Sequence, residues 1–163
     1  MFRCALAELD EISLSVTTFG SSVVVQFPVG YDESTGFRYS IAAAFDAVPG
    51  YGDDVKELAF WMTEYDPEED VVYDLRDSLV VKAKIPAQSD RLAILGALRQ
   101  MVGVLIDETS PRVVTMITYD ANLPFQAMRR YRAIASVFAE NGYRVGTSDP
   151  YHGRQTWMME RSA

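Results

Sequence analysis

The chain has 163 residues and a mass of 18.2 kDa, and 48% of its residues are hydrophobic. This size and composition suit one compact domain with its own core, so we expect residues 1–163 to form a single α+β domain. No apolar run approaches the roughly 20 residues that a membrane helix needs, and the first residues are too acidic for a signal peptide. We therefore expect a cytoplasmic protein with no membrane partner.

The charge is unevenly distributed along the chain. Residues 1–111 carry 8 basic and 19 acidic side chains, whereas residues 112–163 carry 7 basic and 4 acidic ones. This asymmetry favours an acidic face and a basic face that steer a partner or that meet in a homo-oligomer. A pI near 4.6 and the lack of a DNA- or RNA-binding motif argue against a nucleic-acid partner.

Two residue types that often bind metals occur once each, as Cys4 and His152. They cannot supply a disulfide within the chain or a four-ligand zinc site. Carboxylates in residues 66–77 stand at five ligand positions of a calcium-loop pattern, but Val71 occupies the sixth position, where the sharp turn needs glycine. We therefore predict neither a metal nor a cofactor.

The first half of the sequence predicts antiparallel strands. Two β-branched runs flank Gly20, and a loop with Gly30 and Gly36 precedes another extended run. Residues 53–65 are ambiguous, because acidic residues at their start suit a helix cap whereas three large apolar residues in succession suit a buried strand; we favour a helix at the start. Residues 77–85 read as a strand that ends before a proline.

The pattern changes period at Ser89. Apolar residues recur at spacings of three and four through residue 108, which predicts a largely buried helix. Residues 112–119 follow as an interior strand. A second helix begins at Pro124 and stops at Asn141-Gly142, with its arginines off the apolar stripe. The fold class is therefore α+β, a mostly antiparallel mixed sheet in which a β-rich half precedes strand, helix, strand, helix and hairpin.

The final hairpin holds the one histidine. Extended runs flank residues 149–153, where an aspartate, a proline and a glycine each suit a turn. We therefore place His152 at an exposed hairpin tip, where no neighbour is obliged to orient it. The chain also lacks a Gly-x-Ser-x-Gly elbow and the glycine-rich phosphate loops, which removes most support for hydrolase and nucleoside-triphosphatase activities.

The order of elements from residue 79 to residue 160 resembles the C-terminal half of the acyl-CoA-dependent N-acetyltransferases related to Gcn5. The stretch KIPAQSDRLA is similar to that family's pyrophosphate loop, with Gln88 and Ala93 at its outer positions. The resemblance implies that Gln88, Arg91 and Ala93 would bind the cofactor, and that Tyr143 or Tyr151 would donate a proton. Arg91 stands where the family has glycine, and Asp90 adds negative charge where an anion would dock.

Two functions are compatible with these patterns. The first is a small binding or regulatory domain that self-associates, and the second is a divergent acyl-CoA-dependent N-acyltransferase. We favour the first, because it needs no intact motif. Its binding surface would comprise Arg129, Arg130, Arg132, Trp157 and Met158. If the strand with Trp157 is the last of the sheet, a second copy could pair with its edge and cover the apolar side chains.

Overall fold

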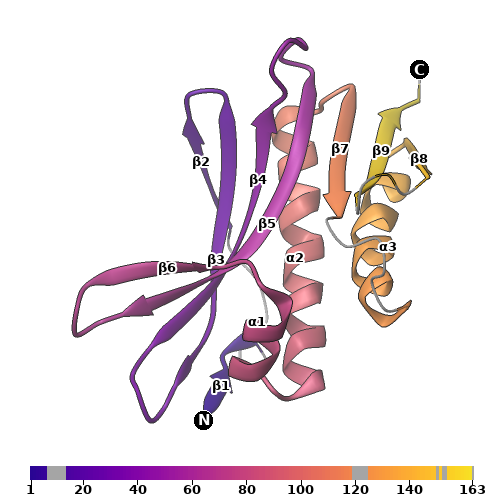
Figure 1. The fold of residues 1–163 in the computed structure, drawn as a ribbon. Coiled ribbons are helices and arrows are strands. Elements are labelled where there is room, and N and C mark those ends of the chain that lie inside the picture. The colour runs from indigo at the N-terminus through magenta and orange to yellow at the C-terminus, as the bar shows by residue number, and fades with distance from the viewer. Residues whose placement is uncertain (7–13, 119–124, 150, 152–153, 163) are drawn as a thin grey trace.

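The computed structural model describes residues 1–6, 14–118, 125–149, 151 and 154–162. In these ranges one mixed sheet of nine strands packs against helices, which confirms the α+β class (Figure 1). The described part of the chain contains no helix with the length and apolar character needed to cross a membrane.

The strands are β1 (Phe2–Cys4), β2 (Ser15–Phe19), β3 (Ser22–Asp32), β4 (Arg38–Ala47), β5 (Val55–Asp66), β6 (Val71–Leu75), β7 (Val113–Thr118), β8 (Tyr143–Thr147) and β9 (Gln155–Arg161). They lie in the order β1-β3-β4-β5-β7-β9-β8, with β2 added to β3 and β6 added to β5. Every recorded strand pair is antiparallel except β5 with β7. The predicted antiparallel first half is confirmed.

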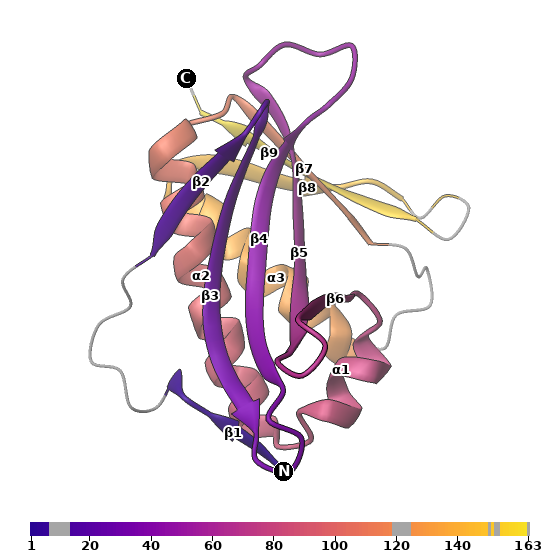
Figure 2. The same cartoon turned by 90° about the vertical axis from the view of Figure 1, so that its left-hand side faces the viewer.

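Three helices are described: α1 (Ser78–Lys84), α2 (Gln88–Thr109) and α3 (Phe125–Glu140). Figure 2 shows α2 and α3 together behind the sheet. Arg99 on α2 donates to the carbonyl oxygen of Ala133 on α3, at 3.2 Å, so the two helices pack against each other on one face. The two long helices predicted from periodicity are confirmed, and Gly142 ends the second with a φ of +86°.

The core lies between these helices and alternate residues of the strands. Tyr39, Ile41, Ala43 and Phe45 on β4 point to the helices and are buried, as the period of two in a strand requires. On β9 the alternation also holds as predicted, because Trp157 and Met159 are buried whereas Met158 is 49% exposed.

Three predictions about secondary structure and order are wrong. The start of residues 53–65 is not helical, because this segment pairs with β4 over ten residues as β5. Residues 77–85 form α1 rather than a strand: the Asp77 side chain accepts from the backbone N–H of Leu79 and caps a helix. The strand with Trp157 is not the edge, because β9 lies between β7 and β8.

The hairpin of β8 and β9 is confirmed, and a bridge between Tyr151 and Arg154 continues it. His152, which we place at its tip from sequence, lies outside the described residues, as does Pro124 before α3.

Candidate ligand site between β5 and β7

The parallel strands β5 and β7 are joined over a short distance only. Their register covers Val55 to Glu57 on β5, and β6 occupies the same edge of β5 from Met62 onward. Between these two pairings, residues 58–61 of β5 have no strand beside them among the described residues. Successive residues of a strand present their backbone groups to alternate edges, so two of these four residues direct N–H and C=O groups into the gap.

Aromatic side chains from three elements lie along this gap on the helix side of the sheet. Tyr131 on α3 lies with its ring centroid 5.8 Å from that of Phe60 on β5. On its other side, Tyr131 stacks on Trp157 of β9 at 6.5 Å. These rings connect β5 to β9 through α3.

Two polar atoms beside these rings lack a partner. Nε of Arg130 and Nε1 of Trp157 are buried, and neither has a hydrogen-bond acceptor among the residues that the structure describes. The guanidinium carbon of Arg130 lies 5.3 Å from the Tyr131 ring centroid, so both donors belong to one cluster with Tyr131. A buried N–H group without an acceptor costs about 1–3 kcal/mol, and a ligand carbonyl or carboxylate oxygen would remove that cost.

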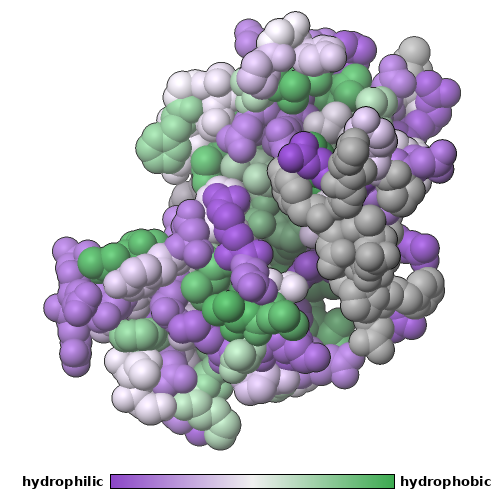
Figure 3. All heavy atoms as spheres, in the orientation of Figure 1, coloured by the Kyte–Doolittle hydropathy of each residue, from purple (hydrophilic) through white to green (hydrophobic). Residues whose placement is uncertain are grey.

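The surface over the gap is apolar. Figure 3 shows green surface near the centre of the side of the sheet that faces away from α2, in the region where β5 and β7 separate in Figure 1. On β4 and β5, Ala44 lies in register with Ala59, and Ala42 lies in register with Trp61. Arg76 covers the Trp61 ring at 4.6 Å. Because successive side chains of a strand point to opposite faces, this apolar surface lies on the other side of β5 from Phe60, and the gap lies between it and the two buried donors.

The residues predicted to bind a cofactor lie at the start of α2. Gln88 and Ala93 are exposed. Arg91 folds back, and its Nη1 donates to the carbonyl oxygens of Ile85 at 2.8 Å and Pro86 at 2.5 Å. The Arg91 side chain therefore holds the linker between α1 and α2. Ala87, the cap residue of α2, makes no side-chain hydrogen bond, and Asp90 contributes a negative charge in the first turn.

The predicted binding surface divides between two environments. Arg130 and the buried Trp157 lie together through Tyr131, as described above. Arg129 and Arg132 are exposed on α3, and Met158 points to the opposite face of the sheet. The structure therefore joins two of the five predicted residues into one cluster.

Neither predicted proton donor lies in the gap. The buried hydroxyl of Tyr143 donates to the carbonyl oxygen of Pro111 at 2.5 Å, and burial raises the pKa of Tyr143 above its usual value. Tyr151 is exposed at the base of the hairpin turn. Tyr143 has a structural role here, because it fixes the end of α2 against the start of β8.

Sequence reasoning missed Phe60 and Tyr131 as members of a site. Both were assigned to a core pattern, and their meeting depends on the pairing of β5 with β7, which are separated by α1 and α2. Within the described ranges, no three His, Cys, Asp or Glu side chains come together as a metal site would require. Comparison of the chain with protein-family models, with curated proteins and with solved structures finds no match.

Proposed function

We propose that this chain is a small ligand-binding domain, and that its ligand is an extended molecule with amide or acyl carbonyl groups. The observation that carries the proposal is the pair of buried donors, Arg130 Nε and Trp157 Nε1, beside a stretch of strand edge that has no partner in the part of the chain that the structure describes. An amide-bearing chain would accept hydrogen bonds from these donors and pair with the free edge of β5. The Phe60 and Tyr131 rings would pack on its apolar parts.

Pantetheine is a suitable probe, because it is an extended diamide without a charged phosphate. In a Trp61→Phe variant, which leaves Trp157 as the one tryptophan, we expect pantetheine to change the fluorescence saturably, with a Kd in the millimolar range or about 4 kcal/mol of binding energy. Trp157→Phe keeps an aromatic ring but removes the donor, so it should weaken binding measured by NMR. The absence of a fluorescence change in Trp61→Phe, or equal binding in the native chain and in Trp157→Phe, would refute the proposed site.

A matched pair of arginine variants separates this site from general electrostatics. Arg130→Met removes a buried donor beside Tyr131, whereas Arg129→Met removes an exposed charge one residue earlier on α3. We expect about tenfold weaker pantetheine binding in the first variant and no change in the second, since a lost hydrogen bond to a buried partner costs about 1 kcal/mol or more. Equal effects in both variants would mean that binding does not depend on the buried Nε of Arg130.

The second candidate function is acyl transfer from acyl-CoA. It is favoured by the one parallel pair, which separates after Glu57, and by the element order around it, which resembles that of the Gcn5-related N-acetyltransferases. We expect no saturable rise of the melting temperature with millimolar acetyl-CoA, because Arg91 and Asp90 replace the open, glycine-rich anion site. A clear rise that Gln88→Ala removes would place the transferase ahead of the binding domain.

We also propose that the domain self-associates. Because β9 has strands on both sides, the free edge at this end of the sheet is β8, next to the exposed Met158. An unpaired edge with an apolar neighbour favours pairing with a second copy. Sedimentation at micromolar protein should show a dimer that Met158→Glu weakens. A monomer at every concentration and at low salt would exclude it.

A further inference from the structure

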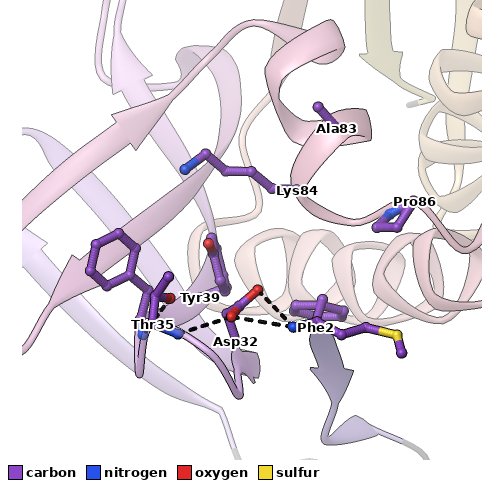
Figure 4. A pocket seen from close by; sticks show the side chains of 9 residues that line it. Phe2, Asp32, Thr35, Tyr39, Ala83, Lys84 and Pro86 are labelled. Carbon is purple, nitrogen blue, oxygen red and sulfur yellow. Dashed lines mark hydrogen bonds and ion pairs between the residues drawn. The ribbon is translucent and has the colours of Figure 1, made fainter.

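A separate cavity lies at the other end of the molecule from the pairing of β5 with β7. It has a volume of about 320 Å³ (Figure 4). Its walls come from β1, from the end of β3 and the start of β4 with the turn between them, and from the end of α1. Phe2, Phe37 and Pro86 form apolar walls, and the lining also holds the Asp32 carboxylate, the Lys84 ammonium and Met1, whose amine lies beside Asp32. Figure 4 shows Asp32 and Lys84 on opposite sides of the cavity, one on the strand end and one on the helix.

The ammonium of Lys84 forms an ion pair with a buried carboxylate. Glu64 on β5 is only 6% exposed, and its Oε2 accepts hydrogen bonds from the ammonium of Lys84 and, at 2.7 Å, from the hydroxyl of Tyr39. Burial, together with Glu64, raises the pKa of Tyr39, so its hydroxyl remains a donor. An ammonium has three N–H groups. Glu64 takes one of them in the described structure, which leaves two for a guest in the cavity.

The carboxylate of Asp32 is held by hydrogen bonds from the turn that this residue begins. Oδ1 accepts from the backbone N–H groups of Ser34 at 2.8 Å and Thr35 at 3.1 Å. These bonds, with the Ser34 hydroxyl, hold the pKa of Asp32 well below its usual value, so the carboxylate is ionised. The second oxygen, Oδ2, lies 3.4 Å from the amine of Met1. The same amine donates to the Ser34 hydroxyl oxygen at 3.0 Å, so one side of the cavity holds a carboxylate with an amine beside it, and the other side holds the Lys84 ammonium.

We propose that this cavity binds a small zwitterion of the α-amino acid class with an apolar side chain. The ligand carboxylate would accept from Lys84, its ammonium would donate to Asp32, and its side chain would pack on Phe2, Phe37 and Pro86. A zwitterion places a carboxylate beside Lys84 and an ammonium beside Asp32, whereas an anion lacks the ammonium and a cation lacks the carboxylate. The volume lies at the small end of the range for ligand pockets, which suits a molecule of this size.

The linker that forms one wall is itself held in place. Pro86 follows α1, and its carbonyl oxygen accepts from Arg91, as does that of Ile85. Ile85 is buried, so the end of α1 is anchored to the core even though no residue within α1 is buried. The two hydrogen bonds from Arg91 and the ion pair of Lys84 with Glu64 thus keep the helix end over the cavity. A wall fixed in this way is prepared for a ligand before the ligand arrives.

A panel of three related molecules tests the charge pattern. L-phenylalanine carries both charges, phenethylamine lacks the carboxylate and 3-phenylpropanoate lacks the ammonium; L-leucine serves as a second zwitterion. We expect saturable shifts of Phe2 and Thr35 amide signals with at least one zwitterion, and at least tenfold weaker binding of both analogues. Failure of both zwitterions to bind at about 20 mM, or an analogue that binds as tightly as L-phenylalanine, overturns the proposal.

Variants assign the charges to their residues. Asp32→Asn keeps the oxygen that caps the turn but removes the charge, and the double variant Lys84→Met with Glu64→Gln removes the ion pair without leaving a buried charge. Each should weaken zwitterion binding tenfold or more, whereas Lys82→Met, on an exposed part of α1, should not change it. Unchanged binding in the double variant overturns the role of Lys84. Pantetheine binding at the β5–β7 gap should be the same in all three, so the two sites are tested independently.

Discussion

The N-terminal and C-terminal parts of the sheet differ in how they are held together and in how they join. Strands β4 and β5 pair over ten residues, and β7 and β9 pair over six, so each part has its own continuous ladder. Among the described residues, the two parts share three residue pairs, between β5 and β7. Beyond these pairs the connection is made by side chains of α2 and α3 on the helix face. Backbone pairing gives each part its shape, and side-chain packing joins them.

This comparison predicts that a single aromatic residue at the junction has a large effect. Phe138 on α3 is fully buried and contacts Phe45 of β4, at a ring distance of 6.3 Å, as well as Tyr143 of β8 at 5.5 Å. We expect Phe138→Ala to lower the free energy of unfolding by about 3–5 kcal/mol, measured by urea denaturation. Phe19→Ala, at a position that is 67% exposed, should change it by less than about 0.5 kcal/mol. Similar losses in both variants would contradict the proposed junction.

A second variant should affect the N-terminal part alone. A Cβ at Gly30 would lie 2.2 Å from the carbonyl oxygen of Arg3, so Gly30→Ala must displace β1 from β3. We expect a loss of about 1–3 kcal/mol and faster amide hydrogen exchange in β1, with unchanged exchange in β7 and β9. Gly146→Ala is the control, since a Cβ there meets nothing within 4 Å. Faster exchange in β9 would show that the two parts unfold as one unit.

The cluster of Tyr39, Glu64 and Lys84 in the N-terminal part should make the free energy of unfolding depend on pH. The pKa of Tyr39 is raised in the folded state, so above pH about 10 the unfolded chain loses a proton that the folded chain keeps. Below that pH the contribution of Tyr39 to the free energy of unfolding does not change with pH. Above it, this contribution falls as the pH rises. Urea midpoints between pH 9 and 11 should fall more steeply for the native chain than for Tyr39→Phe. If the urea midpoints of both proteins fall equally with pH, Tyr39 does not cause the pH dependence.

The smallest effect is expected at the edge of the junction itself. Arg112 Nε lies 2.8 Å from Asp54 Oδ2 at the start of β7, but both side chains are more than half exposed. We expect Arg112→Ala to cost less than about 1 kcal/mol, because water screens an exposed ion pair. The backbone N–H of Arg112, which donates to the carbonyl oxygen of Asp54 at 2.8 Å, is retained in the variant. A loss above about 2 kcal/mol would mean that this ion pair, rather than helix packing, joins the two parts.

Local sequence patterns were sufficient for those elements whose structure has a local cause. The apolar spacing of α2 and the glycine after α3 predict both helices, and β-branched alternation predicts the hairpins. Residues 78–84 were predicted as part of a strand, because Val80 and Val81 favour extended structure. They form a helix, because the Asp77 side chain caps its first turn. The alternation expected of a strand is not visible in β5, because both faces of that strand are partly covered and apolar residues follow one another at Phe60, Trp61 and Met62.

The candidate sites were less accessible to sequence reasoning than the fold. Arg130 and Trp157 were singled out for charge and for edge exposure, yet they meet through Tyr131, which no spacing rule connects to Trp157. The cavity between Asp32 and Lys84 depends on three separate elements, and one of them, α1, was assigned to the wrong class. Sites of this kind depend on which strands are neighbours, and local patterns do not fix that order.

The position of β9 between β7 and β8 also affects how the chain is made. On the ribosome, β7 emerges before α3 and β8, and its outer edge has no partner until β9 follows. During that interval the N-terminal ladder can already form, because its strands are adjacent in sequence, while an apolar strand edge stays open. The C-terminal part therefore folds late, and nascent chains that pause before residue 155 expose the edge that is most able to pair with another molecule.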